Sequence, residues 1–201
     1  MTIQFPDFLR PILGRMTWRK SKQERVIYLT FDDGPIPEVT PKVLAILDEY
    51  EVKATFFCVG ENVQKHPDVY AQVLSRGHRT GNHTFNHIKG VLIPAEVYVD
   101  NVERTAQLID SKLFRPPHGL ITRSQRKALE ADYEIIMWDL ITHDYNKSIS
   151  PQTIIKTIKR KSRNGMIVVF HDSLKAEENM MAVLPMALEF WKKEGYQFGL
   201  L

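Results

Sequence analysis

Five groups of ionisable residues in this sequence each follow a short apolar run, and their residue types are those that carry acid, base and metal chemistry. In chain order they are Asp32-Asp33, His83 with His87, Arg115 with His118, Asp139 with Asp144, and His171-Asp172. In a parallel α/β barrel, the residues that follow the strands meet at one edge of the sheet. We therefore expect these groups to form a single site.

The adjacent carboxylates Asp32 and Asp33 end the apolar run at 26–31. Two neighbouring negative charges repel each other and lose hydration unless a positive partner compensates them. His83 and His87 indicate that partner, because histidines four residues apart share one face if the segment is helical, and zinc uses this spacing. A carboxylate is the usual third ligand of a catalytic zinc, so either aspartate can bind the metal while the other faces the attacking water.

Each group also has an ordinary structural explanation when it is considered alone. An Asp-Asp-Gly sequence is common in turns, His171 could be a hydrogen-bonded core histidine, and Arg115 with its prolines could belong to a rigid loop. Their joint occurrence after successive strands favours one shared site.

The hydrophobic pattern alternates between short strands and helices along the chain. Strands are predicted at residues 26–31, 54–59, 78–82, 113–114, 134–138, 165–170 and 196–200. Helices are predicted at residues 41–50, 69–76, 94–112, 124–131, 150–160 and 178–193, with Ser124 and Ser150 as N-caps. About seven alternating units predict a single-domain, distorted (β/α)7–8 barrel of parallel strands, with a doubly wound open sheet as the alternative.

The composition is that of one domain with a substantial core, because 43% of the 201 residues are hydrophobic and 25% are charged. The single cysteine, Cys58, excludes an intramolecular disulfide. A net charge of +3 without a long basic run argues against nucleic-acid binding. A monomer is expected.

Residues 1–25 are expected to form an N-terminal extension that packs on a catalytic domain at 26–201. Pro6, Asp7 and Arg10 interrupt the apolar stretch that a signal peptide would need, so a cytoplasmic protein is expected unless a signal was removed. The sequence contains no apolar run long enough to cross a membrane. The basic and apolar residues of the extension suit packing over the bottom of the barrel, which we favour, or contact with a membrane surface.

Five motifs resemble, in order, those of the NodB-homology polysaccharide deacetylases, carbohydrate esterase family four. They are TFDDGP at 30–35, HTFNH at 83–87, RPPHG at 115–119, WDLITHDY at 138–145 and VFH at 169–171. The resemblance implies a metal-dependent hydrolase that removes N-acetyl groups from an amino-sugar polymer or oligomer similar to peptidoglycan or chitin.

The resemblance also implies a role for each matching residue. Asp33, His83 and His87 would hold a divalent metal, zinc by default, with cobalt or nickel as substitutes. Asp32 would be the general base toward the attacking water, and His171 the general acid that protonates the leaving amine.

Further residues would support these groups. Arg115 would orient Asp32, and a buried guanidinium needs a carboxylate partner from the fourth motif. Asp144 is the favoured partner within hydrogen-bonding reach of Arg115, and Asp139 is the alternative. The residues expected to contact the substrate, the last three around its small acyl group, are Pro117, His118, Trp138, Tyr145 and Val169.

The sequence departs from the family pattern at two positions. His118 replaces the usual aromatic residue of the third motif, although a backbone N–H near Pro117 and His118 is still expected to stabilise the oxyanion. Ile141 occupies an acidic position of the fourth motif, which leaves the partner of the arginine open between the two aspartates. Asp172 would either orient His171 or act as a cap.

The same residues leave two other functions open. One is a deformylase or deacetylase of a lipid-linked amino-sugar at the membrane surface, which the basic N-terminus would suit. The other is a non-catalytic carbohydrate-binding protein, which is disfavoured because all expected proton carriers and ligands are present.

Overall fold

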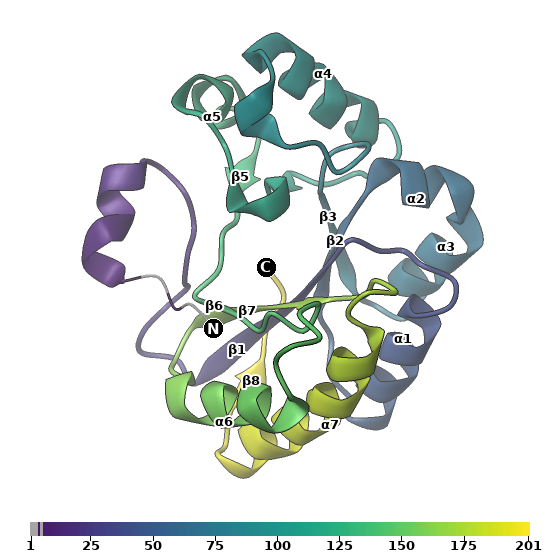
Figure 1. The fold of residues 1–201 in the computed structure, drawn as a ribbon, viewed down its shortest axis with the longest axis vertical. Coiled ribbons are helices and arrows are strands. Elements are labelled where there is room, and N and C mark those ends of the chain that lie inside the picture. The colour runs from purple at the N-terminus through teal and green to yellow at the C-terminus, as the bar shows by residue number, and fades with distance from the viewer. Residues whose placement is uncertain (1–3, 5) are drawn as a thin grey trace.

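The sheet of the computed structural model contains eight strands (Figure 1), and the structure describes residue 4 and residues 6–201. The strands are β1 (Val26–Asp32), β2 (Thr55–Cys58), β3 (Arg79–Asn82), β4 (Leu113–Phe114), β5 (Glu134–Ile135), β6 (Leu140–Ile141), β7 (Met166–His171) and β8 (Gln197–Phe198). The α-helices are α1 (Thr40–Glu49), α2 (Gly60–Lys65), α3 (Pro67–Ser75), α4 (Ala95–Ala106), α5 (Arg123–Leu129), α6 (Pro151–Lys161) and α7 (Glu177–Lys193). Short 3-10 helices are η1 (Asp7–Leu13), η2 (Gly90–Leu92) and η3 (Pro117–Gly119).

The strands pair in the order β5-β4-β3-β2-β1-β7-β6, with β8 also paired to β1, and all these pairs are parallel. The helices surround this sheet (Figure 1). The predicted single-domain α/β fold is confirmed, as a half-barrel that ends at β5 on one side and at β6 on the other.

Strand β7 is buried on both faces and the neighbouring β1 is buried along most of its length, which is typical of parallel strands covered by helices. Alternate residues of β7 point to opposite sides of the sheet. Val168 and Phe170 pack in the main core with the helices, whereas Ile167 belongs to a cluster inside the barrel. The same alternation directs Val169 and His171 into the barrel, with His171 at its edge.

The register of the strands brings their carboxyl ends together. Asp32 at the end of β1 pairs with His171 at the end of β7. The last residues of β3 and β4 also pair with each other, so His83 and Arg115, which follow them, start from neighbouring positions. This register gathers at one edge the residues that follow the strands in the sequence.

The N-terminal segment covers the open side of the half-barrel. Thr17 forms a parallel bridge with Ile136 just after β5, and Gln4 forms an antiparallel bridge with Leu140 in β6. Arg19 forms a further bridge with β7. The segment therefore packs along the side of the barrel between its two ends, whereas we expected it to cover the bottom.

Most predicted elements agree with the structure within a few residues, with three main differences. The strand predicted at 134–138 ends early, as β5, because the backbone that follows Ile135 bonds to Thr17 and Arg115, and β6 was not predicted. Helix α2 was not predicted, and Thr122 rather than Ser124 caps α5 through a capping box. No helix in the described part of the chain is long and apolar enough to cross a membrane.

Candidate active site

Two histidines and one aspartate converge at the carboxyl edge of the sheet. One ligand atom from each of Asp33, His83 and His87 lies within 4.8 Å of the other two. Oδ1 of Asp33 is 3.3 Å from Nε2 of His87 and 3.9 Å from Nε2 of His83. Two imidazole nitrogens and one carboxylate oxygen form a ligand set typical of catalytic zinc, which leaves coordination positions open for water or substrate.

His83 is held in the state that a metal ligand requires. Its Nδ1 lies 2.7 Å from the carbonyl oxygen of Arg115, which can only accept a hydrogen bond, so Nδ1 carries the proton. Nε2 is then left with its lone pair on the side of Asp33. Burial lowers the pKa of His83 to about 4, against the opposing effect of nearby carboxylates, so the ring is neutral at pH 7.

Asp33 is held as an anion beside these rings. Burial opposes its ionisation, but electrostatic interactions, first with His171 and then with the rings of His83 and His87, together with a hydrogen bond from Ser173, outweigh burial and lower the pKa of Asp33. A φ of 86° at Asp33 breaks the extended geometry of β1, so the two adjacent aspartates take different partners. The cluster therefore fits a divalent cation in both charge and donor type.

The segment that carries the two histidines is a loop, so the helical spacing considered from the sequence does not apply. Thr84 and His87 have φ values of 63° and 55°, in the left-handed region. The side chain of Asn82 accepts a hydrogen bond from the backbone N–H of Thr84, and that of Asn101 accepts one from Phe85. These bonds hold a tight loop that turns both rings toward Asp33.

Asp32 is paired with Arg115 in the interior of the barrel. Nη1 of Arg115 lies 2.6 Å from Oδ1 of Asp32 and 2.8 Å from the hydroxyl of Thr30. The remaining guanidinium nitrogens donate to the carbonyl groups of Ile136 and Met137. The arginine is fully buried and each of its three guanidinium nitrogens donates a hydrogen bond, so it fixes the position of Asp32.

Neither aspartate that we predicted as the partner of Arg115 contacts it. Asp144 binds His171 instead, and Asp139 binds Arg10 and Arg163 beside the N-terminal segment. The prediction is wrong because Asp32 and backbone carbonyl groups already satisfy the guanidinium. An additional carboxylate is therefore not required.

His171 and Asp144 form a buried pair on the other side of the cavity. Nδ1 of His171 lies 2.7 Å from Oδ1 of Asp144, and the backbone N–H of His171 donates to Oδ2. Burial alone would lower the pKa of His171, but Asp144, followed by Asp33 and Asp32, raises it to about 9. His171 is therefore protonated at neutral pH, with Nδ1 facing Asp144 and Nε2 available to the cavity.

Asp172 acts as an anchor of the β1–α1 loop and not as a partner of His171. Its carboxylate accepts hydrogen bonds from the backbone N–H of Gly34 and from the hydroxyl of Thr40. Burial, followed by the charge of Asp33, raises the pKa of Asp172 to about 8. A Cβ on Gly34 would lie 2.0 Å from this carboxylate, which explains the glycine after the aspartate pair.

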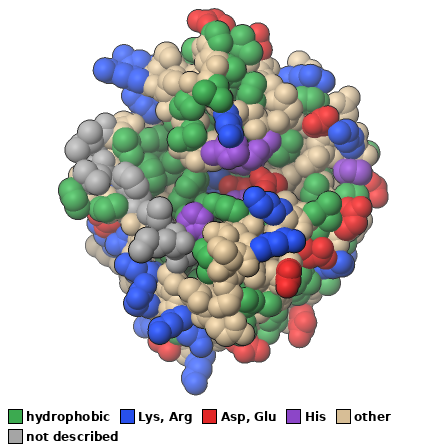
Figure 2. Space-filling view, viewed as in Figure 1, with side chains coloured by type: hydrophobic (Ala, Val, Ile, Leu, Met, Phe, Trp, Pro, Cys, Tyr) green, Lys and Arg blue, Asp and Glu red, His purple; other side chains and the backbone are tan. Residues whose placement is uncertain are grey.

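These groups line one cavity of about 680 Å³. Figure 2 shows histidine and acidic side chains side by side near the centre of this face. The residues that line the cavity are Leu13, Trp18, Asp32, Asp33, His83, His87, His118, Gly119, Met137, Trp138, Ile141, His143, Tyr145, His171, Ser173 and Lys175. Another cavity, of about 730 Å³, lies between the N-terminal segment and residues 130–135; Trp18 lines both cavities, but the metal-ligand cluster, Asp32 and His171 line only the first.

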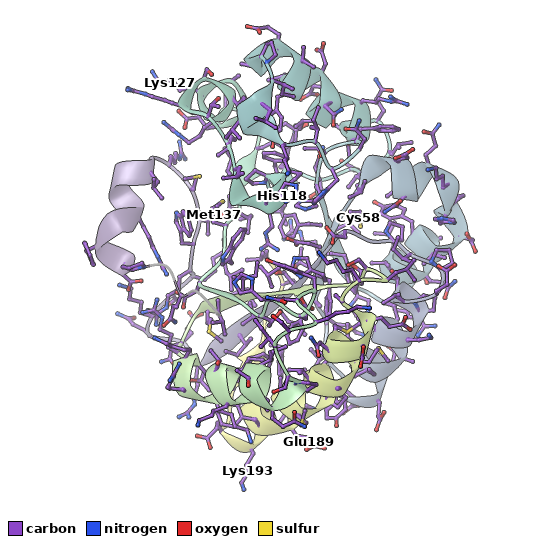
Figure 3. The ribbon with its side chains drawn as sticks, in the orientation of Figure 1. Cys58, His118, Lys127, Met137, Glu189 and Lys193 are labelled. Atoms are coloured by element: carbon purple, nitrogen blue, oxygen red, sulfur yellow. The ribbon has the colours of Figure 1, made fainter. Side chains whose placement is uncertain are left out.

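Three of the five predicted substrate contacts, His118, Trp138 and Tyr145, line the cavity. Figure 3 labels His118 and Met137 toward the middle of the molecule, whereas Glu189 and Lys193 lie on the outer helix α7. The ring of His118 packs against that of His87 at a centroid distance of 4.6 Å, and Tyr145 packs edge-on against His171.

Pro117 and Val169 do not line the cavity. Val169 lies two residues below His171 on β7 and is fully buried. Its neighbour across the β6–β7 pair, Ile141, lies on the cavity wall instead. Sequence reasoning treated Ile141 only as a departure from the motif and missed this position.

Sequence reasoning also missed several supporting residues. Thr30 precedes the expected aspartates by two residues, and the period of a strand could have placed it on the side of Asp32. Asn82, Asn101 and Ser173 act through hydrogen bonds to the site that no local pattern indicates.

Comparison with known proteins agrees with this geometry. A protein-family model described as polysaccharide deacetylase matches residues 19–135. A peptidoglycan-N-acetylglucosamine deacetylase of Bacillus cereus is 35% identical over 193 residues, which are 92% of this chain and 90% of that protein. A chitooligosaccharide deacetylase of Rhizobium leguminosarum bv. trifolii is 30% identical over 165 residues, which are 77% of this chain and 75% of that protein.

A solved structure extends the similarity to the whole fold. A crystal structure of a peptidoglycan N-acetylglucosamine deacetylase in complex with 4-naphthalen-1-yl-N-oxidanyl-benzamide matches with a TM-score of 0.90 at 28% identity. The match covers 98% of this chain and 95% of that one. The chain therefore belongs to the polysaccharide deacetylase family, carbohydrate esterase family four.

Proposed function

We propose that this protein removes the N-acetyl group from N-acetylglucosamine residues of peptidoglycan or a similar polymer, with one divalent metal ion, zinc by default. The observation that carries the proposal is the placement of the Asp33–His83–His87 cluster, Asp32 and His171 around one cavity. A metal site, a base and an acid are the functions that amide hydrolysis requires. The names of two relatives support the peptidoglycan substrate.

The metal would be held by Asp33 and by the Nε2 atoms of His83 and His87. A divalent ion there would lower the pKa of water toward ~7 and polarise the acetamido carbonyl. The cluster supports zinc because His83 is neutral and its Nδ1 is fixed by a carbonyl group. Cobalt or nickel would substitute, since imidazole and carboxylate ligands do not select strongly among these ions.

Asp32 is proposed as the general base and His171 as the general acid. Arg115 binds Oδ1 of Asp32, so we assign to Oδ2 the proton taken from the attacking water. His171 shares its Nδ1 proton with Asp144 and would give its Nε2 proton to the leaving nitrogen. The two groups can hold opposite protonation states at pH 7, because Asp144 keeps the imidazole charged.

The remaining lining residues are proposed to hold the acetamido group. The backbone N–H of His118, which follows the fixed φ of Pro117, would donate to the oxyanion. Trp138, Tyr145 and Ile141 would pack around the methyl group, with Ile141 in the role that we had predicted for Val169. A small apolar wall favours acetyl over larger acyl groups.

The membrane alternative, the expected monomeric state and the expected cytoplasmic location are not supported by any contact or site in the described residues. No feature of the described site favours a lipid-linked sugar over a polymer. Monomeric state and cellular location stay predictions, which size-exclusion chromatography with light scattering and cell fractionation would test.

An acetate-release assay tests the proposed function. Metal-stripped protein, with and without added zinc, would be given peptidoglycan fragments, chitin oligomers and acetylated xylan. We expect zinc-dependent acetate release from the first two substrates, with the highest kcat/KM on peptidoglycan fragments. Release only from xylan, or equal release without metal, would contradict the proposal.

A further inference from the structure

The N-terminal segment forms part of the wall of the catalytic cavity. Leu13, at the end of η1, and Trp18 line the same cavity as the metal-ligand cluster, although they lie outside all five family motifs. Leu13 is 42% exposed, so a ligand can cover it. Figure 2 shows hydrophobic side chains beside the central histidines on this face.

An ion-pair network centred on the buried Asp139 holds this segment in place. Asp139 is 0% exposed, lies directly before β6, and accepts hydrogen bonds from Arg10 in η1 and from Arg163. Arg163 and Arg10 also pair with Asp7 at the start of η1. Two residues of η1 are thereby tied to the barrel on the side that carries Trp138.

Backbone bonds fix the second half of the segment. The N–H of Thr17 donates to the carbonyl of Ile135, and the N–H of Met137 donates to the carbonyl of Thr17, both at 2.8 Å. Met137 also binds the guanidinium of Arg115 through its carbonyl group. Trp18, which follows Thr17, is therefore positioned by the same backbone that supports Asp32.

We propose that Leu13, backed by Trp18, which is only 7% exposed, forms an apolar subsite for the pyranose ring next to the one that is deacetylated. The proposal rests on the proposed function, because it assumes a glycan substrate. A sugar in a polymer continues through its glycosidic bonds, so the chain must leave the reacting centre along a wall of the cavity. The C–H face of a pyranose is apolar and packs on indole and aliphatic side chains.

The size and continuity of the cavity support this occupant. A volume of about 680 Å³ is in the range that holds a ligand of drug size, far larger than one acetamido group. The same cavity is lined by the apolar side chains of Trp138 and Ile141 and by those of Trp18 and Leu13. A second sugar ring is the part of the substrate that would reach this wall.

A matched pair of variants tests the subsite. Leu13→Ala shortens the side chain in the cavity, whereas Phe8→Ala changes a 77% exposed residue of the same helix that lines neither cavity. For the zinc-loaded enzyme, Leu13→Ala should raise KM for the tetramer of N-acetylglucosamine about 3- to 10-fold, as expected for the loss of partly buried apolar area. We expect kcat to stay within about twofold, and Phe8→Ala to behave as the unchanged protein.

A binding measurement separates this proposal from the proposed function. Tetramer affinity would be measured by calorimetry with Leu13→Ala and Phe8→Ala, each combined with Asp32→Asn to prevent turnover. Weaker tetramer binding by the Leu13→Ala variant, but not by the Phe8→Ala variant, supports the subsite. Failure to release acetate from any substrate would reject only the proposed function and would leave this result standing. Equal affinity of the two variants, or no tetramer binding, would overturn the subsite.

Discussion

The catalytic floor and the N-terminal wall are two regions of the cavity. Each depends on a buried aspartate, and the two aspartates lie only five residues apart in the sequence. We define the floor as the residues that follow the strands, together with Asp144, which binds His171. We define the wall as Leu13 and Trp18, together with Asp139, which binds Arg10 of the same segment. Asp144 and Asp139 are both 0% exposed. Asp144 pairs with an imidazole, whereas Asp139 pairs with guanidinium groups.

Because their partners differ, the two aspartates have different roles: Asp144 acts on proton transfer, and Asp139 positions a segment of the chain. An imidazole can gain or lose a proton near neutral pH, so a carboxylate beside it sets the proton affinity of an acid. A guanidinium does not exchange protons in this range, so Asp139 beside Arg10 and Arg163 acts by holding these side chains in place. Substitutions in the floor should therefore change kcat, and substitutions in the wall should change KM and local stability.

The largest effect is expected from the metal-ligand cluster of the floor. His83→Ala removes one of three ligands and should abolish both stoichiometric zinc binding and acetate release. The control is His118→Ala, whose ring packs on His87 but is not part of the cluster. Zinc content by atomic absorption should fall only in His83→Ala. Loss of the metal in His118→Ala alone would show that the ligands are assigned wrongly.

The next effect concerns Asp144 in the floor. Asp144→Asn should lower the pKa of His171 from about 9, because burial then acts without the compensating negative charge. Turnover should fall by ~10²–10⁴, the usual contribution of a general acid, and the basic limb of the pH–rate profile should move to lower pH. The pKa of His171 can be measured by NMR titration of the metal-free protein. Asp139→Asn is the control and should leave that pKa unchanged.

The same pair predicts how stability depends on pH. The folded-state pKa of His171 lies above the unfolded value of 6.5, so the stabilisation from protonated His171 is fully present below pH 6.5. It is lost as the pH rises through about 9. Urea unfolding of the metal-free protein at pH 6 and pH 9.5 should show this loss, and Asp144→Asn should reduce it. An equal loss in both proteins would exclude the pair as its source.

A smaller effect on activity is expected from Asp139 in the wall. Asp139→Asn removes the charge between Arg10 and Arg163 and should cost about 3–5 kcal/mol of stability at this buried position. The N-terminal segment should become more sensitive to limited proteolysis, and KM for oligomers should rise while kcat changes little. A fall in kcat as large as that of Asp144→Asn would remove the distinction between floor and wall.

The sequence allowed the floor to be predicted better than the wall. The period of β1 and β7 and the order of the motifs identified the residues that follow the strands, and parallel register brings Asp32 and His171 together. The partner of Arg115 could not be predicted, because backbone carbonyl groups of Ile136 and Met137 supply acceptors that no residue type reveals.

Two other features depend on tertiary contacts that a sequence pattern does not contain. The loop from His83 to His87 relies on positive φ values and on hydrogen bonds from its backbone N–H groups to the side chains of Asn82 and of the more distant Asn101, so the helical spacing considered from the sequence does not explain why the two histidines meet. The wall depends on a network between Arg10, Asp139 and Arg163, which are far apart in the sequence.

The most direct test of the proposed catalytic assignment is to measure zinc content and acetate release on the same samples of Asp32→Asn and Asp33→Asn. The account assigns the metal to Asp33 and the proton transfer to Asp32, two adjacent residues with different partners. Asp32→Asn should keep one zinc ion per chain and lose turnover by ~10²–10⁴, whereas Asp33→Asn should lose both metal and activity. Retention of zinc by Asp33→Asn together with its loss from Asp32→Asn would contradict the account.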